Sequence, residues 1–484
     1  MRGTGGDENP LHSQIFGFSA VELSQSAMAD QQYDYDYFVL GAGSGGVRTS
    51  RIAATHGARV AVVECAPLGG TCVNVGCVPK KLMTYGAHFT EDVAGAHAFG
   101  WNVEKPTLDW PRFIENKNNE ILRLNGIYKK ILENAGVTIL YGKGAFVDAH
   151  TIEVTSETGE KKTYTSKYIT IAVGGWPFVP DIPGKELGIT SNEAFYLKDR
   201  PKKVLIVGGG YIAVEFAGIF HGYGAEVIQV YRGEKWLRGF DGDIRTHLEE
   251  EYRKQGIDLR FNTNCTAMAK NAAGGITCTL TDGSTVDVDV AMFATGRKPR
   301  TADLRCEAAG VELAPDGSVV VDEAFLTKAP SVYAIGDVIN RMQLTPVALA
   351  EGHCLSDTLF GGKPRKTSYS DVPTAVFSHP NIGTVGLTEE EARQQHGDVH
   401  IYRTSFRAMK HTLTKKEEKT LMKLIVHPTT NKVLGVHMCG DAAGEIIQFA
   451  GICLKAGATK EHFDSTIGVH PTSAEEFVTM RSRV

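Results

Sequence analysis

The apolar and polar positions in the first part of the chain follow the pattern of a nucleotide-binding α/β unit. An apolar run at Tyr37–Leu40 leads into a glycine-rich turn, and a helical stretch follows from about Ser44. A second apolar run covers Arg59–Val63 and ends in Glu64. The pattern predicts a strand, a tight turn, a helix and a second strand in that order.

The turn of this first unit contains Gly41, Gly43 and Gly46 in the spacing G-x-G-x-x-G. Such glycines allow a tight turn, a close approach of backbone to pyrophosphate and close packing of helix on strand. The N-terminus of the helix adds free N–H groups and a partial positive charge. Glu64, about 20 residues further on, can accept hydrogen bonds from a ribose. We predict a dinucleotide site here, the alternative being a glycine turn without a ligand.

The same pattern recurs in the middle of the chain. An apolar run at Val204–Val207 precedes Gly208-Gly209-Gly210, a helical stretch, and a second run at Glu226–Tyr231. The third position of the glycine fingerprint is Ala213, which is a permitted variant. The chain therefore holds a second predicted dinucleotide unit.

The second unit differs from the first at the end of its second strand. Arg232 stands where an acid is expected, and Arg238 follows six residues later, with Glu234 between them. A carboxylate would repel a 2′-phosphate, whereas arginines bind one through charge-assisted hydrogen bonds. The pattern predicts NADPH rather than NADH at this site, and the alternative is a solvated basic loop.

Three later segments each join a short apolar strand to a glycine turn, at residues 172–175, 293–299 and 332–338. The last of them places Asp337 at a strand end, where it could hold a polar ligand group. From about Asp371 the pattern changes to a sheet with helices and no phosphate loop, which is typical of an α+β domain.

Composition limits the class of protein. With 484 residues, the chain is too long for one hydrophobic core, so several domains are expected. A formal net charge of -5 gives no electrostatic reason to expect nucleic acid or an anionic membrane as partner. No apolar run reaches the roughly 18 residues of a membrane span.

The first 33 residues are acidic and poor in arginine. They lack a cationic start followed by an apolar core, so we expect neither a secretory signal nor a transit peptide. We predict a flexible tail, with Met28 as a possible alternative start, and a cytoplasmic location.

Nine cysteines are scattered along the chain except for Cys72 and Cys77 in "LGGTCVNVGCVPKK". An odd and sparse set of this kind suggests a reducing compartment. Three readings of the pair are open: two small buried hydrophobes, half of a zinc site, or a reversible disulfide. No second close pair exists to complete a zinc site, although His437 and Cys439 are near each other.

The reversible disulfide makes a structural prediction. A disulfide requires Cα atoms about 4.4–6.8 Å apart. Residues five apart in a regular helix point to different sides, so no regular helix should run through both cysteines. Gly76 and Pro79 permit such a break. Lys80 and Lys81 add positive charge, which favours a thiolate.

"GGTCVNVGCVPKK", the two glycine loops, "ATG", "GD" and the terminal "HPTSAEE" together resemble the pyridine nucleotide-disulfide oxidoreductase family. The resemblance extends from about Asp34 to Val484, and it is strongest to the members that reduce glutathione disulfide. It implies two Rossmann-like dinucleotide-binding domains plus a C-terminal α+β dimerisation domain. It also implies one tightly bound FAD per subunit in the first site, NADPH in the second, and a homodimer.

The resemblance also gives domain limits. We expect a tail over 1–33, an FAD-binding domain over 34–171, an NADPH-binding domain over 172–299, a central segment that completes the FAD domain over 300–370, and an interface domain over 371–484.

The resemblance implies a division of roles among four catalytic residues. Cys77 would face the flavin and receive its electrons, and Cys72 would attack the substrate disulfide. His470 of the other subunit would be the acid and base, oriented by Glu475. These roles suit the chemistry, because thiol-disulfide exchange needs a thiolate attacker and a leaving thiolate that can be protonated. Histidine serves both steps near neutral pH.

Further positions match cofactor-binding residues of the family one by one. Lys80 and Glu215 match an ion pair beside the flavin ring, and Tyr211 matches a tyrosine that covers the flavin until the nicotinamide enters. The predicted FAD contacts are Gly41, Gly43, Ser44, Gly45, Gly46, Glu64, Thr71, Cys72, Lys80, Asp337 and Thr345. The predicted NADPH contacts are Gly208, Gly210, Tyr211, Ile212, Ala213, Glu215, Arg232, Arg238 and Gly296. No metal is expected.

The choice of disulfide depends on fewer residues. Glutathione disulfide is rich in carboxylates, so its site should offer cations. The predicted substrate residues are Ser44, Arg48, Arg51, Tyr128 and His353, where His353 replaces an arginine of the animal enzymes. A related disulfide, trypanothione-like or lipoamide, is the alternative substrate. A flavin-binding protein without disulfide turnover is the alternative from another class.

Overall fold

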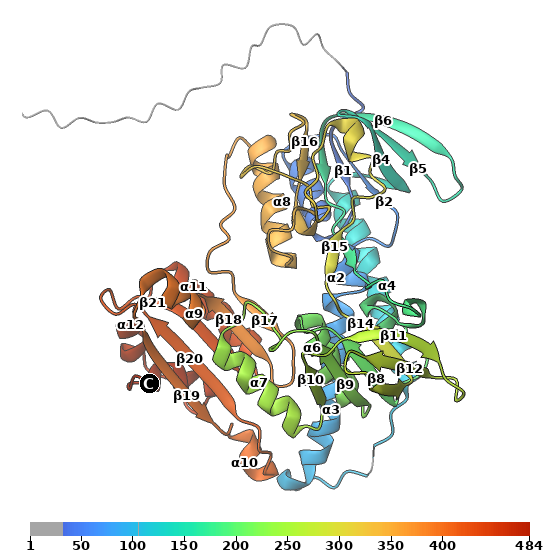
Figure 1. Ribbon diagram of the computed structural model, residues 1–484. Coiled ribbons are helices and arrows are strands. Elements are labelled where there is room, and N and C mark those ends of the chain that lie inside the picture. Colours follow the sequence, from blue (N-terminus) through green and yellow to red (C-terminus); the bar gives the residue numbers. More distant parts are fainter. Residues whose placement is uncertain (1–31, 105) are drawn as a thin grey trace, which may run out of the picture.

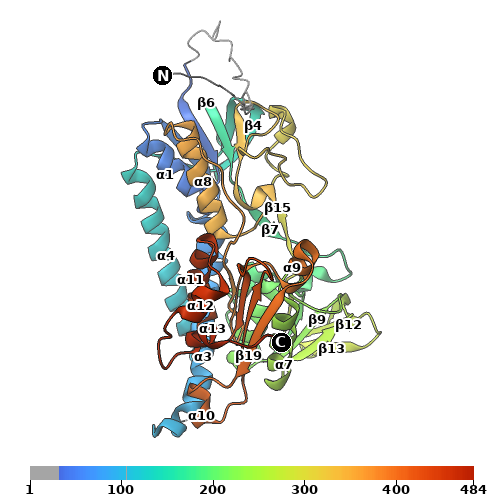
Figure 2. The same ribbon diagram turned by 90° about the vertical axis from the view of Figure 1, so that its left-hand side faces the viewer.

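The computed structural model describes residues 32–484 except residue 105. The first glycine unit and its sheet form one end of the molecule (Figure 1). The second glycine unit and the C-terminal sheet lie side by side at the other end. The long helices α3 (Cys77–Gly95) and α4 (Trp110–Asn134) run between the two ends (Figure 2). The predicted N-terminal tail, with Met28, lies almost entirely outside the described residues.

The sheet of the first end has seven strands, in the order β3-β2-β1-β6-β5-β4 with β16 also paired to β6. Strands β1, β2, β3 and β16 run parallel to their neighbours, whereas β4 and β5 add an antiparallel hairpin. Helix α8, from the predicted central segment, packs on α1 and so completes this end. The strands are β1 (Tyr35–Leu40), β2 (Val60–Glu64), β3 (Thr138–Tyr141), β4 (Lys143–Asp148), β5 (Thr151–Thr155), β6 (Lys161–Ile171) and β16 (Val332–Ala334), and the helices are α1 (Ser44–Thr55), α2 (Gly70–Asn74), α8 (Thr345–Leu359) and the 3₁₀ turns η1 (Ala96–Phe99), η3 (Cys306–Ala309) and η4 (Gly336–Ile339).

The second unit is built on a four-stranded parallel sheet in the order β10-β9-β8-β14. An antiparallel sheet, β11-β12-β13, packs its apolar face against it and forms a shared core. The strands are β7 (Gly175–Pro177), β8 (Lys203–Val207), β9 (Glu226–Tyr231), β10 (Asp258–Phe261), β11 (Cys265–Lys270), β12 (Ile276–Leu280), β13 (Thr285–Val288), β14 (Val290–Phe293) and β15 (Arg297–Pro299), and the helices are α5 (Ser191–Ala194), α6 (Tyr211–Gly222), α7 (Gly242–Lys254) and the 3₁₀ turn η2 (Lys185–Leu187).

The C-terminal part is a five-stranded antiparallel sheet in the order β17-β18-β21-β20-β19, with α11 against β18 and β21. Strand β20 lies between β21 and β19, and all of its residues are buried, including Lys423. The predicted fold class is therefore confirmed. The strands are β17 (Thr374–Val376), β18 (Ile382–Gly386), β19 (His400–Phe406), β20 (Thr420–Val426) and β21 (Val433–Cys439), and the helices are α9 (Glu389–His396), α10 (Lys410–Thr414), α11 (Ala443–Lys455), α12 (Lys460–Ser465), α13 (Glu476–Thr479) and the 3₁₀ turn η5 (Ser473–Glu475).

Candidate active site

The two cysteines lie on either side of a break between two helices. Helix α2 ends at Asn74, and α3 begins at Cys77. Gly76 between them has non-helical backbone angles, and a Cβ there would lie 2.6 Å from the carbonyl oxygen of Thr71. The predicted interruption of the helix is confirmed. The break lets the thiols of Cys72 and Cys77 hydrogen-bond to each other.

The surroundings of Cys77 favour its thiolate. The hydrogen bond from Cys72 holds the pKa of Cys77 down at about 6, against the opposing effect of burial. The Thr345 hydroxyl, 3.7 Å from Cys77 Sγ, and the charge of Lys80 lower this pKa further. The same hydrogen bond raises the pKa of Cys72. When both cysteines are reduced, Cys77 is therefore the one that carries the negative charge near neutral pH.

Lys80 and Glu215 form the ion pair that the sequence predicts. Lys80 Nζ lies 2.8 Å from Glu215 Oε1, and the two side chains are only 11% and 4% exposed. A buried pair of this kind depends on further hydrogen bonds. The backbone N–H of Phe377 supplies one, at 2.9 Å from the same oxygen. The pair joins α3 to α6 one turn after Cys77.

A single cavity of about 1410 Å³ connects the first glycine turn, the cysteines and the ion pair. Most of the predicted FAD contacts line it, together with three predicted NADPH contacts. The lining residues among them are Gly41, Gly43, Ser44, Gly45, Glu64, Thr71, Cys72, Lys80, Asp337 and Thr345, and then Tyr211, Ile212 and Glu215. The predicted catalytic residue Cys77 lines the cavity as well. Gly46 does not line it but is buried beneath the turn.

The acid at the end of β2 is held in place by backbone donors. Glu64 accepts hydrogen bonds from the backbone N–H groups of Ala42, Cys65 and Ala66, each at 2.8–2.9 Å. Burial raises the pKa of Glu64, and these donors oppose that effect. Across the cavity, burial also raises the pKa of Asp337. Two carboxyl groups thus lie in the cavity where ribose or ribityl hydroxyls could donate to them.

The predicted NADPH arginines lie at the surface, outside this cavity. Arg232 and Arg238 are both exposed, and neither has an ion-pair partner among the described residues. The backbone N–H of Leu237 donates to the carbonyl of Gly209 at 2.7 Å, which ties the arginine segment to the second glycine turn. The arginines are thus free to meet an anion beside that turn. The predicted NADPH contacts Gly208, Gly210, Ala213 and Gly296 also lie outside the cavity lining.

The predicted substrate residues come from three helices. Arg48 and Arg51 lie on α1, Tyr128 on α4 and His353 on α8. Burial lowers the pKa of Arg48, and neighbouring Arg51 lowers it further. Burial also raises the pKa of Tyr128, and the Cys72 thiol adds to this rise. Electrostatic interactions thus link Arg48 to Arg51 and to Tyr128, and Tyr128 to Cys72.

His353 is held by an acid. Its Nε2 lies 3.6 Å from Asp357 Oδ2, and the same carboxylate meets His56 at 2.9 Å and Arg365 at 3.3 Å. Burial lowers the pKa of His353, Asp357 opposes this, and Arg365, Arg48 and Arg51 lower it further. The histidine is therefore mainly neutral near pH 7, in contrast to an arginine at this place.

The predicted acid and base, His470, does not reach the cysteines of its own chain. Its Nδ1 lies 3.1 Å from Glu475 Oε2, as the predicted pairing requires. Its side chain is 80% exposed, however, and it is absent from the cavity lining. Figure 1 shows the C-terminal end on the outer part of the interface domain. Within one chain, therefore, the predicted catalytic set is incomplete.

Some residues at the site were not predicted from the sequence. Arg297 donates to Thr71 Oγ1 at 3.3 Å and to the carbonyl of Gly175. It directly follows the "ATG" segment, so that motif could have pointed to it. Glu351 accepts from the backbone N–H of Gly336 at 2.6 Å, beside Asp337. Phe377 follows β17 in "AVFSHP", which gives no comparable signal.

The zinc reading of the cysteines finds no support. The described residues hold no group of three or more histidine, cysteine or acidic side chains that could bind a metal ion. His437 is buried in β21, and its ring nitrogens contact Thr384 and the carbonyl of Leu387. A role for Cys72 and Cys77 as mere buried hydrophobes is also disfavoured, because both line the cavity.

No helix within residues 32–104 and 106–484 is long and apolar enough to cross a membrane. The cytoplasmic location stays a prediction, because it depends on the first residues of the chain, which the structure leaves undescribed.

The chain resembles known proteins over nearly its whole length. It is 48% identical to "Glutathione reductase, chloroplastic/mitochondrial" of Pisum sativum over 473 residues, which covers 96% of this chain and 85% of that protein. It is 48% identical to a glutathione reductase of Nostoc sp. over 462 residues, covering 93% and 100%. It is 46% identical to a trypanothione reductase of Leishmania donovani over 470 residues, covering 93% and 96%.

Two family models match as well. Residues 35–352 match "Pyridine nucleotide-disulphide oxidoreductase", and residues 372–481 match its dimerisation domain. The first match contains both glycine turns and both cysteines, and the second contains His470 and Glu475. This chain belongs to the pyridine nucleotide-disulphide oxidoreductase family.

Proposed function

We propose that this chain reduces glutathione disulfide to two molecules of glutathione with NADPH as electron donor. The observation that carries the proposal is the Cys72–Cys77 pair, which lies in the large cavity with its lower-pKa thiol beside the Lys80–Glu215 ion pair. Two relatives named glutathione reductases, at 48% identity over at least 93% of this chain, support the choice of substrate.

The cavity fits a flavin dinucleotide. Gly41 has φ +98°, and a Cβ there would lie 2.7 Å from the carbonyl oxygen of Ala172. Only glycine leaves the turn open for a pyrophosphate at this point. We propose that FAD lies along this turn, with its ribose at Glu64 and its ring near Lys80 and Cys77. Bound FAD would supply the two-electron transfer between the nicotinamide and the disulfide.

The two cysteines divide the work on the substrate. His470 of the partner subunit would take the proton of the Cys72 thiol, and the Cys72 thiolate attacks one sulfur of glutathione disulfide. The substrate S–S bond breaks, and the first glutathione leaves as a thiolate that takes this proton back. Cys77 Sγ, held as a thiolate, then attacks Cys72 Sγ. This step releases the second glutathione thiolate and restores the Cys72–Cys77 disulfide. Two electrons from NADPH return the pair to its dithiol form for the next cycle.

We propose a homodimer as the active unit, because each leaving thiolate needs a proton. His470 of the partner subunit would supply it, with the Glu475 carboxylate orienting the ring. Exposed apolar side chains on the C-terminal domain support an association surface, since Phe449 on α11 is 70% exposed and Ile467 is 92% exposed. The match to a dimerisation domain points the same way.

The positive charges of the predicted substrate residues favour glutathione disulfide over trypanothione disulfide, which is cationic. Arg48 interacts electrostatically with Arg51 and Tyr128, and Tyr128 interacts with Cys72. The positive charge of the two arginines complements the carboxylates of glutathione disulfide and would repel the polyamine of trypanothione disulfide.

The test is NADPH oxidation by the purified protein with glutathione disulfide, trypanothione disulfide and lipoamide in parallel. We expect rapid turnover with glutathione disulfide and NADPH, little with NADH, and none in a Cys72→Ser variant. Turnover with trypanothione disulfide instead would reject the substrate and keep the thiol mechanism. Wild-type turnover by Cys72→Ser would reject the mechanism itself.

A further inference from the structure

Phe377 of the C-terminal domain reaches the ion pair beside Cys77. It follows directly after strand β17, and its backbone N–H donates to Glu215 Oε1 at 2.9 Å. The same oxygen accepts from Lys80 Nζ at 2.8 Å. A residue of the interface domain thus shares an acceptor with the lysine that lies one turn after Cys77.

The ring of Phe377 covers two ammonium groups. Lys80 Nζ lies 4.0 Å from the ring centroid, and Lys81 Nζ lies 3.7 Å from it. Both distances are well within the range of cation–π attraction. On α11, Gly444 leaves room for the ring, because a Cβ there would come within 3.2 Å of it. The ring is therefore held in contact with both lysines.

Phe377 borders two cavities. It lines the large cavity that holds the cysteines, and it lines a second cavity of about 500 Å³ between α3, α6 and the interface domain. A smaller side chain would join the two spaces and bring water to the Lys80–Glu215 pair. Water would weaken the effect of the Lys80 charge on its neighbours, since charge interactions fall as the local dielectric rises.

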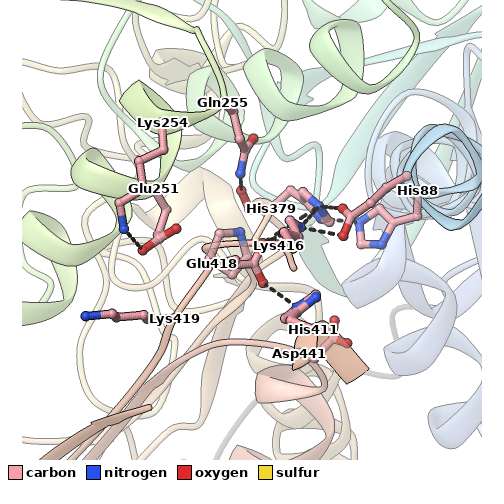
Figure 3. A network of polar contacts seen from close by, with 12 residues as sticks. His88, Glu251, Lys254, Gln255, His379, His411, Lys416, Glu418, Lys419 and Asp441 are labelled. Carbon is pink, nitrogen blue, oxygen red and sulfur yellow. Dashed lines mark hydrogen bonds and ion pairs between the residues drawn. The ribbon is translucent and has the colours of Figure 1, made fainter. Parts of the chain in front are cut away.

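The backbone after Phe377 is anchored by a polar network around His379 (Figure 3). His379 Nδ1 lies 3.0 Å from His88 Nε2, and its Nε2 contacts the Glu91 carboxylate, both on α3. Lys416 bonds to the same carboxylate, and Gln255 donates to the carbonyl of His379 at 2.8 Å. The network fixes this segment to α3 and to the end of α7.

We propose that Phe377 is a positioning residue, which holds the Lys80–Glu215 pair in place and keeps water from it so that Lys80 stabilises the Cys77 thiolate. The proposal rests on the proposed function of the cysteine pair. Phe377 acts through Lys80, whose charge lowers the pKa of Cys77, whereas the charge of Glu215 raises it.

The test follows the Cys77 thiolate directly. The NADPH-reduced enzyme is titrated with acid, and the long-wavelength absorbance of the thiolate–flavin contact gives the midpoint. In Phe377→Leu we expect the midpoint to rise by about half a pH unit, as loss of a cation–π contact of ordinary strength implies. Phe377→Tyr, which keeps the ring, should stay at the wild-type midpoint. Phe377→Met is a second variant without a ring, and it should shift like Phe377→Leu.

Phe113→Leu serves as the matched control, because Phe113 packs on Trp110 and Tyr223. It should leave the midpoint unchanged. Equal midpoints in wild type and in both variants without a ring would overturn the inference and leave the proposed function intact. A shift in Phe377→Tyr as large as in Phe377→Leu would overturn it too. If reduced wild type shows no long-wavelength absorbance at all, the proposed function fails instead.

Discussion

The two glycine units of this chain have the same order of strand, turn, helix and strand. They differ in how closely the helix packs on the turn and in the charge at the end of the second strand. In both, the first glycine has a positive φ, +98° at Gly41 and +149° at Gly208. A Cβ would lie 2.7 Å from the carbonyl oxygen of Ala172 in the first unit and 2.2 Å from that of Ala294 in the second. Both turns therefore require glycine for the same steric reason.

The units differ at the third fingerprint position. A Cβ on Gly46 would lie 1.8 Å from the carbonyl oxygen of Gly41, whereas Ala213 carries a Cβ at the matching place. Helix α1 therefore sits closer to its turn than α6 does. The units also differ at the end of the second strand. In the first unit Glu64 accepts hydrogen bonds from backbone N–H groups, whereas in the second unit Arg232 is exposed. The comparison teaches that units with one backbone pattern can differ in how closely the helix packs on its turn and in the charge at the end of the second strand.

Exchanging the third position between the units should give the largest effect. Gly46→Ala must push α1 from its turn, so we expect a loss of about 3 kcal/mol in the free energy of unfolding, as for overpacked cores, and loss of flavin. Ala213→Gly removes only a methyl group near the start of a helix, at a cost of about 1 kcal/mol. Denaturant unfolding and flavin absorbance measure both. Similar losses of unfolding free energy in the two variants would contradict the closer packing of α1 on its turn.

The second largest effect is expected from removing the positive charge of the second unit. Replacing Arg232 and Arg238 together by alanine removes two charged contacts of about 1.5–3 kcal/mol each, so the KM for NADPH should rise at least about a hundredfold. The KM for NADH should change by no more than about twofold, because NADH lacks the 2′-phosphate. Steady-state kinetics with both cofactors decide the matter. An equal rise for both would show that these arginines do not recognise the phosphate.

Cys77 lies between the two units, and its charge should follow pH. Its pKa in the folded protein is depressed to about 6, so the thiolate exists above that value and is lost as the pH falls through it. The long-wavelength absorbance of the NADPH-reduced enzyme should therefore fall by half near pH 6. A midpoint near the ordinary value for a free thiol, about 8.5, would contradict the described environment.

The smallest expected effect concerns the substrate side of the first unit. His353→Arg adds a fixed charge beside Arg48 and Arg51, where the histidine is mainly neutral. A partly exposed ion pair is worth up to about 1 kcal/mol, so the KM for glutathione disulfide should fall about threefold. The matched control, His353→Gln, should leave it close to the wild-type value. An unchanged KM in His353→Arg would place this position outside the substrate site.

The sequence predicts those parts of the fold that have a local pattern, such as glycine spacing or an apolar run. The strands and helices of both glycine units follow from glycine spacing and apolar runs, and the break between α2 and α3 follows from the geometry of the cysteine pair. Strands β3–β5 and the β11–β13 sheet were not predicted, because their apolar positions are short and partly exposed. Their pairing is decided by the sheet or core that they join.

The candidate active site also contains residues that no local sequence pattern predicts. Lys80 and Glu215 are 135 residues apart in sequence, and family resemblance rather than any local pattern joined them. The sequence does not predict Phe377, because a hydrogen bond from its backbone N–H and contacts of its ring with lysines leave no motif. His470 pairs with Glu475 through local geometry, but it does not line the cavity that holds the cysteines of its own chain. The proposed contact with the cysteines of a partner subunit leaves no signal in the pattern of one chain.

The central claim is that NADPH delivers electrons to the Cys72–Cys77 pair, and thiol labelling tests it most directly. The oxidised protein is alkylated under denaturing conditions before and after incubation with NADPH, without disulfide substrate, and the labelled cysteines are located by mass spectrometry. We predict that Cys72 and Cys77 resist alkylation before NADPH and become labelled after it, while NADH has little effect. Equal labelling of both cysteines before and after NADPH would contradict the account.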